Sequence, residues 1–309
     1  MAELIEVASN LKFPEGPIAM PDGSVILVEM FGPRLSRVHP DGTVETIAEV
    51  PGGPNGAAIG PDGAAYVANN GGRFTMLEND GLMFPGPTTP GKYLGGSISK
   101  VNIETGEVTD LYTECNGVKL VAPNDLVFDD QGGFYFTDHG MTEDEDRMAH
   151  LTGIYYAKAD GTSIKEVVFP AHEPNGIGLS PDGTILYWAE TWNGRVMRRK
   201  ITGPGEVEAV DMVDTWQCLY GLPGFQLLDS LGIDGDGNVC VATLVNGGIT
   251  VISPDGQLVD FVPADDLLTT NICFGGDDLR TAYITLSGTG KLMKTQWPRP
   301  GAKLNYLNT

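Results

Sequence analysis

Six segments of this chain each place one polar residue directly before an apolar stretch. The polar residue is always an acid or an asparagine, so the set offers two carboxylates and four amide oxygens. A hard cation with flexible geometry, such as calcium, binds about six to eight oxygen ligands. The imidazole and thiolate ligands that zinc and copper prefer do not occur at these positions. The pattern indicates a cation site if the fold brings the six together: Glu15, Asn55, Asn124, Asn175, Asp229 and Asn271.

A structural explanation of the same residues is an Asx turn, because an asparagine after proline often turns the chain into a strand. That explanation would suffice for one asparagine. It does not explain why six aligned positions are all polar, or why two of them are acids. We therefore favour the site interpretation.

The elements that position these residues form a repeat. Asp-Gly occurs nine times and Pro-Asp-Gly five times, between short β-rich segments such as SVILVEM, GFYFTDH and TILYWAE. Asp-Gly between apolar runs indicates a tight hairpin turn. Each unit begins with the polar residue, continues as strand, turn and strand, and is followed by further strands. The successive polar residues are separated by 40, 69, 51, 54 and 42 positions.

Six units of about 40 to 50 residues with four strands each are typical of a β-propeller. The sequence thus predicts an all-β, six-bladed β-propeller with four-stranded antiparallel blades, forming one domain over residues 1–309. The innermost strands should direct their polar residues into one mouth of a central channel. The last unit lacks a strand, and we expect the N-terminal segment ELIEVAS to supply it; residues 302–307 are the alternative.

Three segments outside the repeat are candidates for controlling access and specificity. Segments 71–96 and 140–152 are predicted to be irregular loops over the mouth, acting either as substrate lids or as plain surface loops. Segment 216–227 is a third specificity loop. The first segment could form an apolar lid, which would imply a partly apolar substrate. Its apolar residues are Phe74, Met76, Met83, Phe84 and Tyr93.

Charge and composition narrow the classes of partner. The chain has 41 Asp and Glu against 19 Lys and Arg, a formal net charge of −22. Such a surface repels phosphate backbones and anionic lipid, so we expect neither nucleic acid nor membrane as a partner. The four cysteines are widely spaced, as expected for free thiols, and neither a secretory signal nor a membrane span is evident. We expect a cytoplasmic protein with a small-molecule substrate, and the oligomeric state stays open.

The motifs PEGP at 14–17, PND at 123–125, PNGIGLSPDG from 174 and LDSLGID from 228 occur in an order and spacing that resemble one family. It is the SMP-30/gluconolactonase/luciferin-regenerating-enzyme family of six-bladed propellers. The resemblance covers essentially the whole chain. It implies one divalent metal, usually calcium, with magnesium, manganese or zinc as alternatives. The implied ligands are Glu15, Asn124, Asn175 and Asp229, with Asn55 and Asn271 lining the same channel as substrate contacts.

The chain also departs from related propellers. Gly232 stands where a squid-type phosphatase would offer an aspartate for a second calcium ion. Asp125 is either a ligand of a structural ion or an exposed turn acid, and we favour the second. No histidine pair of the paraoxonase kind is present. His139, predicted to end an inner strand of the third unit, is a candidate substrate contact, and His172 could lie near the mouth.

These residues lead to an expected reaction. A G-x-S-x-G motif is absent, and no G-x-G-x-x-G motif lies between a strand and a helix, which disfavours serine hydrolases and nicotinamide enzymes. The expected activity is calcium-dependent opening of a lactone, with Asp229 as general base or nucleophile. The alternatives are phosphotriester hydrolysis, a lyase or isomerase reaction on the same metal, a metal-free enzyme like strictosidine synthase, and a non-enzymatic binding propeller.

Overall fold

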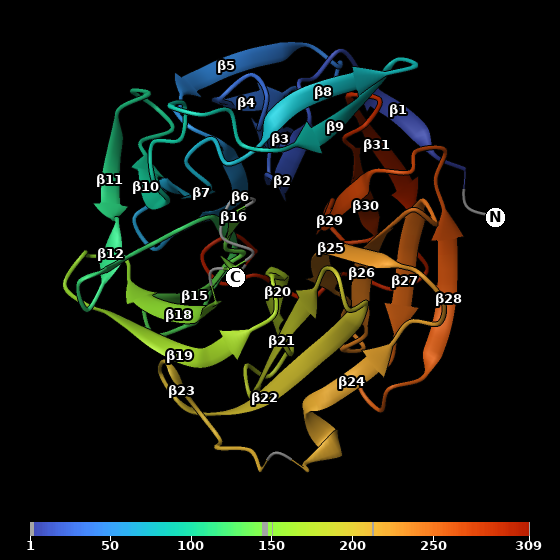
Figure 1. Ribbon diagram of the computed structural model, residues 1–309. Coiled ribbons are helices and arrows are strands. Elements are labelled where there is room, and N and C mark those ends of the chain that lie inside the picture. Colours follow the sequence, from blue (N-terminus) through green and yellow to red (C-terminus); the bar gives the residue numbers. More distant parts are fainter. Residues whose placement is uncertain (1–2, 144–147, 150, 212, 309) are drawn as a thin grey trace.

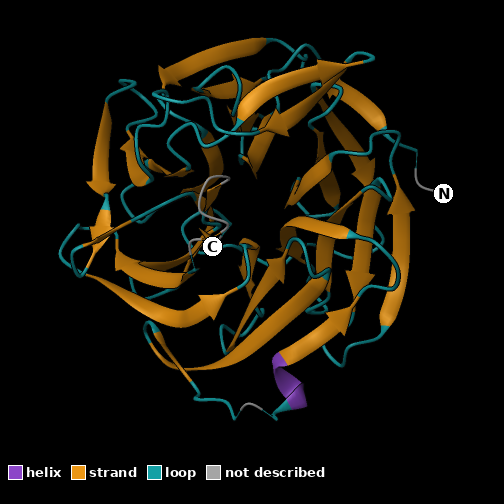
Figure 2. Cartoon of the chain, viewed as in Figure 1, coloured by secondary structure: helices purple, strands orange, loops and turns teal. Residues whose placement is uncertain are grey.

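A ring of antiparallel sheets surrounds a central channel in the computed structural model (Figure 1). The model describes residues 3–143, 148–149, 151–211 and 213–308. The predicted six-bladed β-propeller is confirmed, and Figure 2 shows how completely strands dominate it. The first three blades comprise β2 (Pro14–Ala19), β3 (Val25–Glu29), β4 (Arg34–Val38) and β5 (Val44–Glu49); β6 (Pro54–Ile59), β7 (Ala65–Asn69), β10 (Ser97–Val101) and β11 (Val108–Tyr112); and β14 (Pro123–Phe128), β15 (Gly133–Asp138), β18 (Thr152–Lys158) and β19 (Ile164–Ala171).

In each of blades 1, 2, 3 and 5 the four strands follow one another outward from the channel in chain order. The fourth blade has a divided outer edge, because two short strands pair with different parts of its third strand. The last three blades comprise β20 (Pro174–Leu179), β21 (Ile185–Glu190), β22 (Arg195–Gly203), β23 (Glu206–Val207) and β24 (Cys218–Gly221); β25 (Leu227–Ile233), β26 (Val239–Leu244), β27 (Gly248–Ile252) and β28 (Leu258–Pro263); and β29 (Thr269–Gly275), β30 (Thr281–Leu286), β31 (Lys291–Gln296) and β1 (Ile5–Ala8).

The N-terminal strand closes the ring. β1 pairs antiparallel with β31 and forms the outer edge of the sixth blade, as expected from the sequence. Residues 302–307, the alternative closing strand, instead run across the far end of the channel. Main-chain hydrogen bonds thus join the N-terminal strand β1 to β31 in one sheet.

The Asp-Gly turns hold the strand pairs together at the end of the channel opposite to the polar residues. Asp22 accepts hydrogen bonds at Oδ1 from the Ser24 N–H at 2.9 Å and the Ser24 hydroxyl at 2.6 Å. Gly23 between them has φ +83°, which glycine adopts without steric cost. Asp182 and Thr184 repeat the arrangement in the fourth blade.

The hydrophobic core is divided among the interfaces between blades. Six clusters of buried side chains each join two neighbouring blades, which explains why most strands are apolar on both faces. Aromatic side chains contribute to these interfaces, with Tyr66, Phe134 and Phe136 at 0% exposure. Trp188 is also buried, whereas Trp192 is exposed at the rim.

The prediction that segment 71–96 lacks regular structure is wrong. It forms a hairpin of β8 (Thr75–Asn79) and β9 (Leu82–Gly86), which Figure 1 shows in front of the first blade. The remaining short elements are β12 (Glu114–Cys115), β13 (Val118–Lys119), β16 (Thr142–Glu143), β17 (Met148–Ala149) and a 3₁₀ turn, η1 (Thr215–Gln217). Of the acidic segment 140–152, positions 144–147 and 150 lie outside the described residues. The described part of the chain has no helix long and apolar enough to cross a bilayer.

Candidate functional site

All six repeated polar residues lie near the beginning of an innermost strand. The strands β2, β6, β14, β20, β25 and β29 each contribute one, so the six side chains occupy one end of the channel, which we call the mouth. Five of the six are 2–6% exposed, and Asp229 is partly exposed. The structure therefore places the predicted site residues at equivalent positions around one axis.

A local irregularity accompanies every one of these residues. In each blade the register between the innermost strand and its neighbour shifts at the polar position or directly beside it. Such a β-bulge bends the strand and redirects a side chain that would otherwise follow the strand's alternation. Six bulges at the same height can thus turn six side chains toward the mouth.

Close contact between adjacent innermost strands explains the glycine in PEG and PNG. A Cβ on Gly56 would lie 2.6 Å from the Asn124 carbonyl oxygen, and one on Gly16 would lie 2.7 Å from the Ala57 amide nitrogen. Gly176 meets the backbone of Ser230 in the same way. Each of these three glycines lets its polar neighbour approach the next one around the channel.

Three amide oxygens at the mouth are buried and accept no hydrogen bond from the residues that the structure describes. They are the Oδ1 atoms of Asn55, Asn124 and Asn175. An unsatisfied buried acceptor costs about 1–3 kcal/mol, so these atoms are suited to a ligand. The Asn271 Oδ1 differs, because it accepts the Ile272 N–H at 2.8 Å. The resemblance grouped Asn55 with Asn271, whereas the hydrogen bonds group Asn55 with Asn124 and Asn175.

The carboxylates at the mouth lie close to one another, and no cationic side chain in the described part of the chain forms an ion pair with them. Burial raises the pKa of Glu15 well above its usual range, and the nearby charge of Asp229 raises it further. Burial also raises the pKa of Asp229 to about 7, against a hydrogen bond from Asn175 that lowers it. Asn271 donates to Glu15, with its Nδ2 3.5 Å from Oε2. A bound cation would relieve both the burial of these charges and their repulsion.

Asp125 is a third buried acid that the sequence analysis misjudged. It was expected to be an exposed turn acid, but it is only 7% exposed. Its Oδ1 accepts the Leu126 N–H at 2.8 Å, and burial raises its pKa to about 7. Its charge also raises the pKa of Asp229 and of Glu15. The expectation failed because Asn124 and Asp125 share one bulge, so both are buried where regular alternation would expose one.

The donor set fits a hard divalent cation. The described residues contain no group of three or more His, Cys, Asp or Glu side chains arranged around a metal position. A metal at the mouth would therefore depend on amide oxygens as well as on Glu15 and Asp229. The three unpartnered amide oxygens and the uncompensated carboxylates provide that combination, which suits calcium or magnesium better than zinc.

His139 lies between the beginnings of two innermost strands. It directly follows the last residue of β15, which is the second strand of its blade counted from the channel. Its backbone N–H donates to the Ala122 carbonyl at 2.9 Å, and its ring hydrogen-bonds to the backbone next to Asn175. The Nδ1 atom is buried, and no described residue forms a hydrogen bond with it. Burial lowers the pKa of His139 to about 4, with the Arg73 charge acting in the same direction, so the ring is neutral near pH 7.

The insertion in the second blade extends over the first blade to the sixth (Figure 1). The Met83 N–H donates to the Gly288 carbonyl in the sixth blade at 2.8 Å. On the other side, the Arg73 Nε donates to the Gly140 carbonyl at 2.9 Å, and its guanidinium lies over the Phe74 ring. The Phe74 ring centroid is 6.3 Å from that of His139. The insertion therefore contacts both the third and the sixth blade, a feature that the sequence did not predict.

Comparison with known families agrees with this architecture and with the motifs at the mouth. The family model described as SMP-30/Gluconolactonase/LRE-like region matches residues 13–288. The chain belongs to this family. The matched region extends from the strand entry before Glu15 to the sixth blade, and so contains all six polar positions.

Two relatives and one solved structure are similar to this chain over most of its length. It is 26% identical over 313 residues to the gluconolactonase of Zymomonas mobilis subsp. mobilis, covering 91% of this chain and 78% of that protein. It is 32% identical over 251 residues to the lactonase drp35 of Staphylococcus aureus strain USA300, covering 79% and 68%. The crystal structure of regucalcin from Agrobacterium tumefaciens strain C58, described as a calcium-binding protein, superposes with a TM-score of 0.70 at 17% identity, covering 95% of each chain. That likeness shows the fold.

Proposed function

We propose that this protein is a metal-dependent lactonase that opens a cyclic ester with water at the mouth of the channel. The observation that carries the proposal is the set of unpartnered amide oxygens beside the uncompensated acids Glu15 and Asp229. Membership of the SMP-30/gluconolactonase/LRE-like family and the lactonase names of two relatives support it. The substrate is a small molecule, and calcium is the proposed metal.

Glu15, Asn124, Asn175 and Asp229 would hold the metal, and the unpartnered Oδ1 makes Asn55 a further candidate ligand. A bound calcium ion would act as a Lewis acid toward the lactone carbonyl. Glu15 supplies negative charge, whereas the asparagines supply neutral oxygens, so the site stays electrophilic. Asn271, Asn55 and His139 are the proposed substrate contacts. The neutral His139 offers Nδ1 as an acceptor for a substrate hydroxyl.

Asp229 is the proposed general base. An ionised carboxylate at the mouth can accept a proton from a water molecule within hydrogen-bond reach. It would take a proton from water as the water oxygen bonds to the carbonyl carbon. When the ring C–O bond breaks, the proton passes to the departing alkoxide, and the product is a hydroxy acid. Direct attack by Asp229 on the carbonyl carbon is the alternative role of the same residue.

The test measures acid release from a panel of sugar lactones and apolar γ- and δ-lactones by pH-stat titration. Each lactone is assayed with calcium and again after chelation. We expect calcium-dependent release, and a loss of about 10²–10⁴-fold in kcat for Asp229→Asn, the range typical of a general base. Asp41→Asn removes an exposed turn carboxylate and serves as the matched control. Release that survives complete metal removal would refute the metal assignment.

Two further outcomes would redirect the proposal. Full activity of Asp229→Asn with intact calcium binding would exclude Asp229 as base and as nucleophile. No release from any lactone would refute the lactonase proposal. Phosphotriesters, lyase or isomerase substrates, and protein partners would then be tested.

A further inference from the structure

A cavity of about 590 Å³ occupies the far end of the channel, beyond the polar residues of the mouth. We call it the rear chamber. The later parts of the innermost strands form its walls, and Asp125 and Asn271 line it on the side of the mouth. Its volume lies within the range of about 300–1,000 Å³ that is usual for small-molecule sites.

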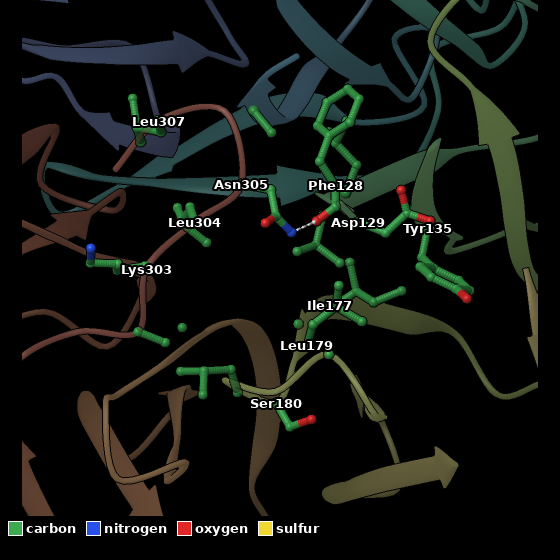
Figure 3. Close-up of a pocket in the computed structure, with 18 of the residues that line it drawn as sticks. Phe128, Asp129, Tyr135, Ile177, Leu179, Ser180, Lys303, Leu304, Asn305 and Leu307 are labelled. Carbon is green, nitrogen blue, oxygen red and sulfur yellow. Dashed lines mark hydrogen bonds between the residues drawn. The ribbon is translucent and has the colours of Figure 1, made fainter. Parts of the chain in front are cut away.

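The C-terminal segment 302–307, which we call the strap, crosses the rear chamber from the fifth blade to the third. The Ala302 N–H donates to the Ile233 carbonyl at 2.9 Å. At the other side, the Asn305 Nδ2 donates to the Phe128 carbonyl at 3.0 Å, and the Tyr306 hydroxyl accepts the Gly132 N–H at 2.9 Å. Figure 3 shows Leu304 of the strap and Ile177 on opposite sides of the open space. The strap therefore bounds the chamber without filling it.

The chamber wall is mainly aliphatic. Each innermost strand contributes a large branched side chain, such as Ile59 from β6, and the strap adds Leu304 and Leu307. The alkyl portion of a ligand would pack against this wall. Both apolar surfaces would then be removed from water, which stabilises binding by about 25 cal/mol per Å² of apolar area. The other strand residues are Ile18, Leu126, Ile177, Leu231 and Ile272.

The charges around the chamber are strongly unequal. Four carboxylates line it, one buried at the inner end and three at the rim, whereas Lys303 is the one cation among the described lining residues. The carboxylates are Asp125, Asp129, Asp130 and Asp182. Asp129 and Asp182 accept hydrogen bonds from their own turns at the rim, and Asp125 accepts the Leu126 N–H at Oδ1. Burial separates them, because only Asp125 of the four is buried. Asp125 is the acid inside the cavity.

We propose that the rear chamber binds a small, mainly aliphatic ammonium ion, with its alkyl part against the innermost strands and its nitrogen toward Asp125. A buried carboxylate is stabilised by an ionic partner, and a charge-assisted hydrogen bond is stronger than a neutral one. The net charge of −22 also concentrates cations near the protein. A carboxylate ligand would meet four like charges, and a neutral alcohol would lack the ionic contact. This proposal does not depend on the lactonase proposal.

The chamber and the mouth should influence each other through Asp125. This acid lines the chamber, and its charge acts on both Glu15 and Asp229. A bound ammonium would partly cancel that charge, so the mouth would attract a divalent cation less strongly. Coupling between two sites is reciprocal. Calcium should therefore weaken ammonium binding by the same factor by which ammonium weakens calcium binding.

The experiment is isothermal titration calorimetry of the full-length, calcium-loaded protein with hexylammonium, hexan-1-ol and hexanoate, without any lactone. We expect one hexylammonium per chain, bound at least tenfold more tightly than hexan-1-ol, and no binding of hexanoate. Leu304→Lys extends a competing ammonium from the half-exposed strap and should weaken hexylammonium binding at least tenfold. Leu304→Met is the matched control and should bind like the wild type. Asp125→Asn should also weaken binding.

Three results would overturn the proposal. Equal affinity for hexan-1-ol and hexylammonium would mean that the chamber selects apolar surface and not charge. Unchanged hexylammonium binding in Leu304→Lys would place the ligand elsewhere. No binding of any probe would mean that the chamber holds solvent only. Because no lactone is present, failure of the lactonase proposal leaves each of these results interpretable.

Discussion

Removing the divalent cation should make the stability of the protein depend on pH in an unusual direction. Without a cation, burial raises the pKa of Asp125 and of Asp229 to about 7. An unfolded aspartate has a pKa of about 3.9. Between these values the folded state binds protons that the unfolded state has released. The contribution of these two acids to the free energy of unfolding therefore decreases as pH rises from about 4 to 7, the opposite of ordinary acid denaturation.

The size of the effect follows from Asp125, which is only 7% exposed. A pKa raised from 3.8 to about 7 corresponds to about 4 kcal/mol in total, because one unit corresponds to about 1.4 kcal/mol. Roughly 3 kcal/mol of this falls between pH 5 and 8, and Asp229 adds in the same direction. Calcium would hold the acids of the mouth ionised, so the calcium-loaded protein should show a smaller slope.

The assay is urea unfolding at pH 5, 6, 7 and 8, with calcium and with a chelator. The chelated protein should become more stable toward pH 5 relative to the loaded protein, and calcium binding at pH 6 should release protons. Asp125→Asn should reduce the slope of the chelated form, whereas the exposed-turn variant Asp41→Asn should leave it unchanged. Equal slopes with and without calcium, together with no proton release, would refute the assignment of a cation to this group of acids.

Further predictions address the histidine, the blade contacts and ring closure. Burial lowers the pKa of His139 from 6.5 to about 4, so the free energy of unfolding should decrease by about 3 kcal/mol as pH falls from 6.5 to 4. His139→Gln should lack this pH dependence in urea unfolding. An unchanged dependence in the variant would show that another group causes it. Gly56→Ala should destabilise the fold by about 1–3 kcal/mol, because its Cβ would meet backbone at 2.6 Å. Gly221→Ala, with its nearest atom 3.9 Å away, should melt like the wild type; equal melting of both variants would contradict the contact argument. Deleting residues 1–9 should lower the Tm and promote association on size-exclusion chromatography, because β31 becomes an unpaired edge; an unaffected monomer would show that β1 is dispensable.

Much of the fold and the positions of the six polar residues could be predicted because the signals repeat. Each unit shows the same order of polar residue, apolar strand and Gly-containing turn, so a weak local signal was confirmed by the others. The Asp-Gly turns at Gly23 and Gly183 formed as expected, because their backbone needs positive φ. The closing role of β1 could be predicted from the missing strand of the last unit.

The sequence could not indicate features that depend on bulges or on contacts between distant segments. The burial of Asp125 follows from a bulge, which no periodic pattern reveals. The hairpin of β8 and β9 did have a local signal, since Asp80 and Gly81 both have positive φ in a two-residue turn. The Gly- and Pro-rich composition around it obscured that signal. The contact between Phe74 and His139 joins the insertion of the second blade to the end of β15 in the third blade, and it has no local signature.

Ring closure by β1 has a consequence for how the protein is made. Of the described strands, β1 leaves the ribosome first, yet its partner β31 is synthesised last. For almost the whole period of translation, β1 has no strand to pair with, and the sixth blade cannot be completed. An unpaired strand is a hazard for association with other chains. Glu3 precedes this strand and Glu6 lies in it, and their negative charges oppose such association while β1 is unpaired.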